Sequence, residues 1–217
     1  MTSRPASQFR LPRPEVRRWV VQKVHVDPEA LSSASIAQDH GLDVPWQAAL
    51  SLARWMAPLP GEALDWWAQA VAGHVVLAPD GPVYRLVDAE GRLAVVRIPA
   101  LWVVREPQQA LSWALMPLDH LLGCWGKSDG RWLSDGGGIA PAWQEVGQQI
   151  ARYFTLGYGW TSDGQSDPHR YLAEGWAAAL MAPRTLNTAD PKLYRLLRAT
   201  LLSPGFWRRH LPAHPEM

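Results

Sequence analysis

EPQQALSWALMPLDHLLG, residues 106–123, separates a strand-rich part of the chain from a helical part. Glu106 and Pro107 open a helix there, because a proline in the first turn lacks only a donor that would have no partner at that position. Pro117 lies inside the same helix, where its missing hydrogen bond predicts a kink. We therefore expect a helix over this stretch, bent near its middle.

Four short runs rich in valine, leucine and tyrosine come before this helix. They are separated by Pro-Asp-Gly, by Ala-Glu-Gly and by Pro99, and such turn residues between apolar runs are typical of strands. The sequence predicts a small antiparallel or mixed sheet made of HVVLAP (74–79), PVYRLVD (82–88), RLAVVRIP (92–99) and ALWVVRE (100–106).

The N-terminal part is expected to be mainly helical. Residues 1–14 hold three prolines and predict a flexible arm. Residues 16–26 fit either a strand or a short amphipathic helix. Asp27, Pro28 and Glu29 form an N-cap followed by a first-turn proline and acid, which predicts a helix running to about His40. Two more helices are expected over residues 44–56 and within residues 58–73.

The part that follows residue 123 is predicted to be a long loop and then helices. Residues 124–140 are rich in glycine and aspartate, and helices are expected at about 142–154, 168–181 and 191–202. Asp167 and Asp190 each stand before a proline, so both are predicted N-caps. Helices first, a sheet next and helices last indicate an α+β fold.

Composition argues against several functional classes. The 217 residues suit one sizeable domain, and 21 Lys and Arg against 20 Asp and Glu give no general attraction to nucleic acid or to an anionic membrane. Cys124 is the only cysteine, so it cannot form an internal disulfide. The sequence lacks an apolar run of membrane-spanning length and a secretory signal pattern, which leads us to expect a cytoplasmic protein without a membrane partner. Thirteen tryptophans make the chain tryptophan-rich, and most of them are expected to fill the core.

Two segments carry a resemblance to a known family. LDHLLG (118–123), with Trp132, Leu133 and Ser134 after it, resembles the continuation of the active-site helix in gluzincin zinc peptidases related to the catalytic domain of anthrax lethal factor. DPHRYLAEGWAAALMAPRTLNTADPKLYRLLR (167–198) is similar to their downstream ligand helix. The resemblance covers residues 59–202. It implies a zincin-like α+β domain over 58–217, preceded by the arm over 1–14 and a helical segment over 15–57.

The resemblance also implies that the zinc chemistry of the family is missing. In its register Ser112 and Met116 take the two histidine positions of HExxH, Trp113 takes the place of the general base, and Arg170 takes the place of the third ligand. Serine, tryptophan, methionine and arginine offer neither an imidazole nor a carboxylate to zinc. We therefore expect no catalytic residue of this kind, no metal and no cofactor.

A guanidinium in place of a metal suggests a new electrostatic role for the same position. Arg170 is expected to pair with a nearby acid, Glu174 or Glu145, and Tyr158 resembles a tyrosine that assists the transition state in some relatives. The predicted vestigial cleft thus consists of Ser112, Trp113, Met116, Tyr158, Arg170 and Glu174.

Other candidate sites are weaker. His120 is expected to be structural or on the surface, and His169 to be exposed at a helix start. His25 and His74 have no partner at metal-ligand spacing, and a proline separates His210 from His214. A hydrolase triad can be assembled from Ser112, His120 and either Asp119 or Asp135, but no GxSxG motif supports it.

These observations favour a non-catalytic pseudopeptidase that binds a protein or a peptide. Three alternatives stay open: a structural subunit of a larger assembly, a hydrolase of another class with an unrecognised site, and, disfavoured by the even charge, a nucleic-acid binder.

Overall fold

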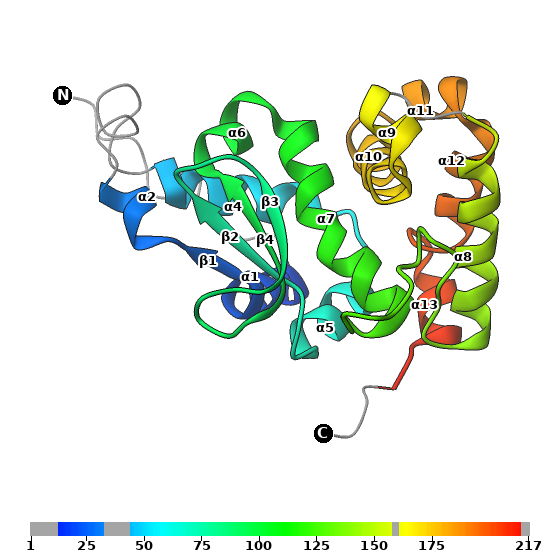
Figure 1. Cartoon of the computed structure of the whole chain (residues 1–217), viewed down its shortest axis with the longest axis horizontal. Coiled ribbons are helices and arrows are strands. Elements are labelled where there is room, and N and C mark those ends of the chain that lie inside the picture. Colours follow the sequence, from blue (N-terminus) through cyan, green and yellow to red (C-terminus); the bar gives the residue numbers. More distant parts are fainter. Residues whose placement is uncertain (1–12, 33–43, 158–160, 214–217) are drawn as a thin grey trace.

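The computed structural model describes residues 13–32, 44–157 and 161–213. Its elements follow the predicted order of helices, sheet and helices, which confirms the α+β class (Figure 1). In chain order they are α1 (Pro14–Lys23), β1 (Val24–Val26), α2 (Pro28–Ser32), α4 (Val44–Met56), α5 (Gly61–Gln69), β2 (His74–Ala78), β3 (Val83–Val87), β4 (Leu93–Pro99), α6 (Ala100–Arg105), α7 (Pro107–Cys124), α8 (Pro141–Phe154), α9 (Ser162–Ser166), α10 (Pro168–Met181), α11 (Pro183–Ala189), α12 (Pro191–Ala199) and α13 (Pro204–His210).

The sheet is mixed, and its strands lie in the order β1-β2-β4-β3. β1, β2 and β4 are parallel, whereas β3 is antiparallel to β4. Three of the four predicted strands are present. ALWVVRE was predicted wrongly, because residues 100–105 form α6. Pro99 starts this helix as its N-cap, and Ala100 and Val103, three residues apart, are both buried on one of its sides.

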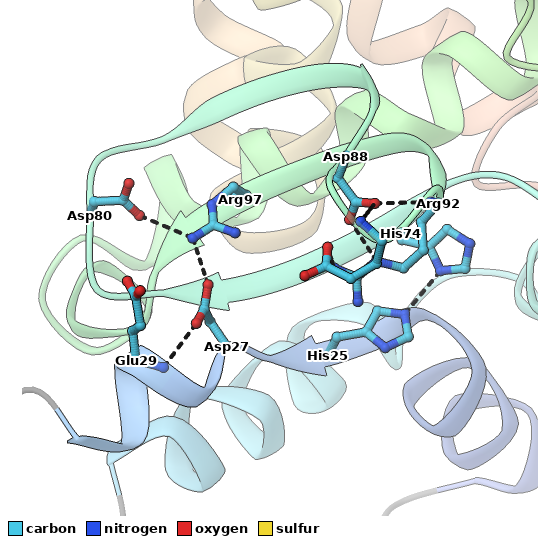
Figure 2. A network of polar contacts seen from close by, with 9 residues as sticks. His25, Asp27, Glu29, His74, Asp80, Asp88, Arg92 and Arg97 are labelled. Carbon is cyan, nitrogen blue, oxygen red and sulfur yellow. Dashed lines mark hydrogen bonds and ion pairs between the residues drawn. The ribbon is translucent and has the colours of Figure 1, made fainter.

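The fourth strand of the sheet comes from the N-terminal segment. Residues 16–26 contain both structures that their pattern allowed, because α1 ends at Lys23 and β1 begins at Val24. β1 pairs with β2, and its end is tied to the rest of the sheet by Asp27. The Asp27 backbone N–H donates to the carbonyl of Leu77 at 2.9 Å, and the Asp27 carboxylate accepts from Arg97 of β4 at 2.6 Å (Figure 2).

Helix α7 lies at the centre of the molecule (Figure 1). It contacts β4 on one side and α10 on the other, so it separates the sheet from the C-terminal helices. The helix is continuous over 18 residues and passes through the buried Pro117. The predicted helix in this stretch is therefore confirmed, whereas the bend expected at Pro117 stays a prediction.

Capping side chains set the boundaries of the C-terminal helices. Asp167 Oδ1 accepts from the His169 backbone N–H at 2.8 Å, and Asp190 Oδ1 accepts from that of Leu193 at 2.9 Å. Both predicted N-caps are confirmed. Three short helices, α9, α11 and α13, were not predicted because each is at most seven residues long.

A few predicted boundaries are corrected or cannot be compared. The helix expected within 58–73 ends at Gln69, four residues before Gly73. The helix expected to reach His40 is described only to Ser32, and its remainder lies outside the described residues. The same holds for the predicted arm except Arg13 and Pro14, the latter being the first residue of α1.

Tryptophans fill much of the core, as expected. One hydrophobic cluster of the described residues extends from Val16 to Trp207. Trp19 of α1 packs against Trp67 of α5 with ring centroids 5.1 Å apart, and Trp143 of α8 meets Trp207 of α13 at 4.7 Å. The core therefore joins the first and the last described helices. No helix in the described part of the chain has the length and apolar character needed to cross a membrane.

Candidate functional site

The residues of the predicted cleft come together where α7 packs against α10. Ser112, Trp113 and Met116 lie on consecutive turns of α7, and Arg170 and Glu174 lie one turn apart on α10. Helix α10 lies beside α7 in Figure 1. Tyr158, the sixth predicted residue, lies outside the described residues.

Arg170 is the centre of this contact. Its side chain is buried, with 6% of the residue exposed. Nη2 donates to Glu174 Oε1 at 2.9 Å, so the expected pairing is with Glu174. Glu145 is exposed on α8 and does not take part. The other carboxylate oxygen of Glu174 accepts from the Thr161 hydroxyl at 2.8 Å, which connects the ion pair to the start of α9.

Trp113 takes part in the same arrangement through its ring. The guanidinium carbon of Arg170 lies 4.6 Å from the centroid of the Trp113 ring, a cation–π distance. Trp113 is thus an aromatic support for the buried cation of Arg170.

Ser112 and Met116 are packing residues in this structure. Ser112 is 1% exposed, and its hydroxyl donates to the carbonyl of Gln109 in the preceding turn at 2.8 Å. Met116 is 5% exposed and belongs to the buried side of α7. Neither side chain offers zinc a ligand of the kind that structural or catalytic zinc sites use. Among the described residues, no three His, Cys, Asp or Glu side chains are grouped so that they can hold a metal ion.

A cavity of about 520 Å³ opens beside the Arg170–Glu174 pair. It lies between the first turn of α7, the start of α9 and the side of α10. Its lining is formed by Glu106, Pro107, Gln108, Gln109, Ser112, Thr161, Asp163, Arg170 and Glu174. Three of the predicted cleft residues, Ser112, Arg170 and Glu174, therefore line a cavity, whereas Trp113 and Met116 do not line it. The other six lining residues were missed as site residues, because only the packing of α7 and α9 brings them to α10: Glu106, Pro107, Gln108, Gln109, Thr161 and Asp163.

Two donors of the Arg170 guanidinium have no hydrogen-bond partner in the described structure, Nε and Nη1. A buried donor without an acceptor costs about 1–3 kcal/mol, and more when the group is charged. The ion pair with Glu174 balances the charge of Arg170 but satisfies only one part of its hydrogen-bonding capacity. Nε and Nη1 are themselves inaccessible to solvent, so they do not face the cavity.

A second polar cluster is formed by Asp119 of α7, Ser134 of the following loop and His169 of α10, and the sequence predicted it only in part. Buried Asp119 accepts from both the backbone N–H and the hydroxyl of Ser134, at 2.9 and 2.7 Å. Burial raises the pKa of Asp119 to about 7, although these two hydrogen bonds lower it. His169 Nδ1 lies 2.9 Å from the Ser134 hydroxyl oxygen, and the ring is about one quarter exposed. The expectation that His169 is exposed is therefore corrected: the 124–140 loop covers it.

His120 has a structural role, which was one of the two roles expected for it. It is fully buried, its ring stacks on Trp132 with centroids 4.4 Å apart, and burial lowers its pKa. Nδ1 accepts from the Tyr84 hydroxyl at 2.5 Å, and Nε2 donates to the carbonyl of Lys127 at 3.0 Å. Both ring nitrogens are thus used by the fold.

The geometry does not assemble a serine hydrolase triad from these residues. The Ser112 hydroxyl donates within its own helix, and the His120 nitrogens are occupied by Tyr84 and Lys127. Ser134 is the serine that lies next to a histidine, but its hydroxyl proton is donated to Asp119 and the residue is buried. A serine whose proton is held by a buried carboxyl group is not activated by the neighbouring His169.

Comparison of the chain with protein-family models, with curated proteins and with solved structures found no match.

Proposed function

We propose that this chain is a zincin-like domain whose zinc centre has been replaced, and that it works as a non-catalytic binding protein for a peptide or a protein segment. One observation carries the proposal. The positions that the family resemblance assigns to zinc chemistry lie at one contact between α7 and α10, yet they hold an Arg–Glu pair on a tryptophan ring. A cavity is retained beside them.

The size and lining of the cavity support binding of a peptide. Its volume of about 520 Å³ is in the usual range for ligand sites. Side-chain amides, hydroxyl groups, carboxylates and one guanidinium line it, which suits the amide groups of a peptide backbone. Trp113 and Met116 are not among the residues that line the cavity, so they do not fill it.

Restoring the zinc ligands tests the register on which the proposal depends. The fourfold variant Ser112→His, Trp113→Glu, Met116→His and Arg170→Glu places the ligand set of the family on α7 and α10. We expect one zinc ion per chain in this variant and none in the natural protein, measured by elemental analysis after dialysis. Stoichiometric zinc in the natural protein would contradict the proposed loss of the metal centre.

Blocking the cavity tests the binding role. Peptides selected on the natural protein from a random displayed library should lose binding to Gln109→Trp, because the indole fills the cavity. Gln148→Trp is the matched control, since Gln148 is exposed on α8 and does not line the cavity. Binding that survives Gln109→Trp, or a selection that yields no peptide, would count against the proposed function.

A further inference from the structure

We infer that the outer side of the last three helices binds the phosphate backbone of a nucleic-acid duplex. The binding surface, called the basic face, consists of five exposed side chains on α11, α12 and α13: Arg184, Lys192, Arg195, Arg198 and Arg209. These three helices lie across α7 from the sheet (Figure 1). None of the five side chains lines the cavity beside Arg170, so the basic face is separate from the proposed peptide site.

Positive charge is concentrated at the C-terminal end of the chain. Residues 183–217 hold six of the 21 Lys and Arg but only two of the 20 Asp and Glu. In the described part of this segment Asp190 is the single acid, and it is buried, where it caps α12 and accepts from the Tyr171 hydroxyl. On α8, which packs against α12, exposed Glu145 and Arg152 offset each other. The even charge of the whole chain therefore conceals a local positive excess.

Helix α12 arranges three of these charges along one side. Its opposite side is buried through three leucines: Leu193, Leu196 and Leu197. Lys192, Arg195 and Arg198 are exposed and occur at every third residue, so they follow one another at intervals of about 4.5 Å along the helix axis. A row of cations of this kind suits an extended row of anions better than a single small anion.

Most of the basic face is not neutralised within the chain. Four of its members form no ion pair with a described acidic residue: Arg184, Arg195, Arg198 and Arg209. Arg208 is left out of the basic face because it pairs with Glu62 at 3.1 Å. Arg195 and Arg209 donate through Nε to carbonyls of their own helices, at 3.0 and 3.1 Å. Their terminal nitrogens can therefore bind an acceptor from outside the chain.

The absence of apolar groups narrows the kind of partner. Within residues 183–210, all of which the structure describes, no large apolar side chain is exposed. A stable protein interface has an apolar core, and a helix that lies on a membrane inserts apolar side chains. A phosphate backbone requires neither, because the release of its counterions supplies the binding free energy. The basic face therefore fits a nucleic acid better than an acidic protein or an anionic membrane.

The side chains present also favour a duplex over a single strand. Four of the five members are arginine, whose planar guanidinium can hold a phosphate through two parallel hydrogen bonds. Single strands are held largely by stacking of their bases on aromatic side chains. In residues 183–213 Phe206 and Trp207 are buried and Tyr194 is half-buried, so no aromatic platform is exposed there. Contacts to phosphates alone do not read sequence, so we expect binding without sequence preference.

Fluorescence anisotropy of a labelled duplex of about 20 base pairs, titrated with the full chain, tests the inference. We expect binding at about 50 mM salt that weakens steeply towards about 200 mM. The logarithm of the association constant should fall with the logarithm of the salt concentration with a slope of about −3 to −4.5, as three to five phosphate contacts predict. One strand of the same duplex should bind more weakly, because no aromatic side chain of the basic face stacks on its bases.

Charge-removing variants assign the binding to the basic face. Lys192→Gln, Arg195→Gln and Arg198→Gln together should weaken duplex binding about tenfold or more and reduce the salt slope by about 3. The matched control, Arg17→Gln, Arg54→Gln and Arg85→Gln, removes as many exposed charges from α1, α4 and β3 and should change the affinity less than about threefold.

A second variant and a cleft variant complete the set. Arg184→Gln with Arg209→Gln changes only the two flanking helices and should weaken duplex binding about threefold or more. Gln109→Trp, which blocks the cavity, should bind the duplex as the natural protein does, since the two sites are separate. Circular dichroism establishes that each variant is folded before titration.

Several outcomes would overturn the inference. These are no duplex binding at about 50 mM salt, an equal loss in the two triple variants, or equal binding of the single strand and the duplex. Vesicles with about 30% phosphatidylserine, and polyglutamate, are the probes for the other two kinds of partner. If either binds more tightly than the duplex and loses this binding in the α12 triple variant, the partner is an anionic membrane or an acidic protein instead.

Discussion

Arg170 and Glu174 form an ion pair whose stability contribution depends on which member is removed. Both side chains are at least nine-tenths buried. Removing one partner of a buried pair leaves an uncompensated charge, which typically costs about 3–5 kcal/mol. Replacing both by apolar residues of similar volume is often close to neutral.

We expect Arg170→Leu to lower the free energy of unfolding by about 3–5 kcal/mol and the double variant Arg170→Leu and Glu174→Leu to recover most of this loss. Urea denaturation at neutral pH measures both. Arg18→Leu is the control, because the Arg18–Asp65 pair is 60% and 30% exposed and should contribute below about 1 kcal/mol. Equal losses for Arg170→Leu and Arg18→Leu would contradict the buried pairing.

Asp119 makes the stability of the folded protein depend on pH. Its pKa is raised from the ordinary 3.8 to about 7, first of all by burial, and the charges of Asp135 and Asp167 act in the same direction. The unfolded chain therefore loses this proton at lower pH than the folded protein does. The contribution of Asp119 to stability is full at acidic pH and is lost as the pH rises from about 4 to about 7.

Asp119→Asn should remove this dependence, because asparagine does not titrate. Urea denaturation at several pH values between 4 and 8 compares the variant with the natural protein. We expect the natural protein to lose stability relative to Asp119→Asn as the pH rises through this range. A constant difference between the two proteins would show that Asp119 does not titrate there.

At the scale of the element, the attachment of β1 to β2 includes a hydrogen bond between two histidine side chains, His25 and His74 (Figure 2). His74 Nε2 donates to the carbonyl of Val71, so its Nδ1 is the acceptor for His25 Nε2–H at 3.0 Å. Protonation of His74 removes this acceptor. Burial lowers the pKa of both rings, that of His74 to about 4, and positive Lys23 and Arg92 lower it further.

Acid should therefore weaken the attachment of β1. A histidine whose folded pKa lies below the ordinary 6.5 contributes stability that is present above pH 6.5 and lost as the pH falls towards 4. His74→Gln should be less sensitive to acid over this window, as followed by urea denaturation at pH 7, 5.5 and 4.5. His210→Gln is the control, because His210 belongs to α13, a helix that lies far from β1 in Figure 1. Equal acid sensitivity of His74→Gln and the natural protein would refute this role.

Several residues on which the predicted resemblance to gluzincins was based have packing roles in this structure. Asp119 of LDHLLG holds Ser134 of the following loop, and a Cβ on Gly123 would lie 2.3 Å from the backbone nitrogen of Leu133. The Tyr171 hydroxyl donates to Asp190 at 2.5 Å. These residues therefore hold the loop and the C-terminal helices in place.

At the scale of the whole molecule, the predicted boundary between residues 57 and 58 divides a continuous core. β1 supplies one neighbour of β2, and Trp19 of α1 packs on Trp67 of α5. Removing residues 1–57 uncovers Trp67 and leaves β2 with an open edge. Exposed apolar surface and an unpaired strand edge are common causes of misfolding.

We therefore expect the fragment 58–217 to lack a cooperative unfolding transition, whereas the fragment 13–217 keeps it. Thermal denaturation followed by circular dichroism distinguishes the two. A sharp transition of the shorter fragment would instead establish residues 58–217 as an independent domain, in agreement with the predicted boundary.

Local sequence patterns predicted much of the fold. The N-caps Asp167 and Asp190, the helix from Pro107 and the three runs of β2, β3 and β4 were read from turn residues, capping residues and apolar spacing. These signals act between residues that are near in the chain. The same signals misassigned residues 100–105, because a short apolar run fits a strand and a buried helix equally well.

The sequence by itself determined the α+β order, the caps and the absence of zinc-binding side chains at Ser112, Trp113, Met116 and Arg170. Only the tertiary structure decided that β1 joins the sheet, that Arg170 pairs with Glu174 over Trp113, and that Glu106 and Asp163 share one cavity with them. The physical reason is the separation along the chain over which each kind of interaction acts. Caps and periodicity depend on neighbours a few residues apart, whereas the cavity arises from side chains up to 68 positions apart, from Glu106 to Glu174, that meet only when α7 and α10 pack.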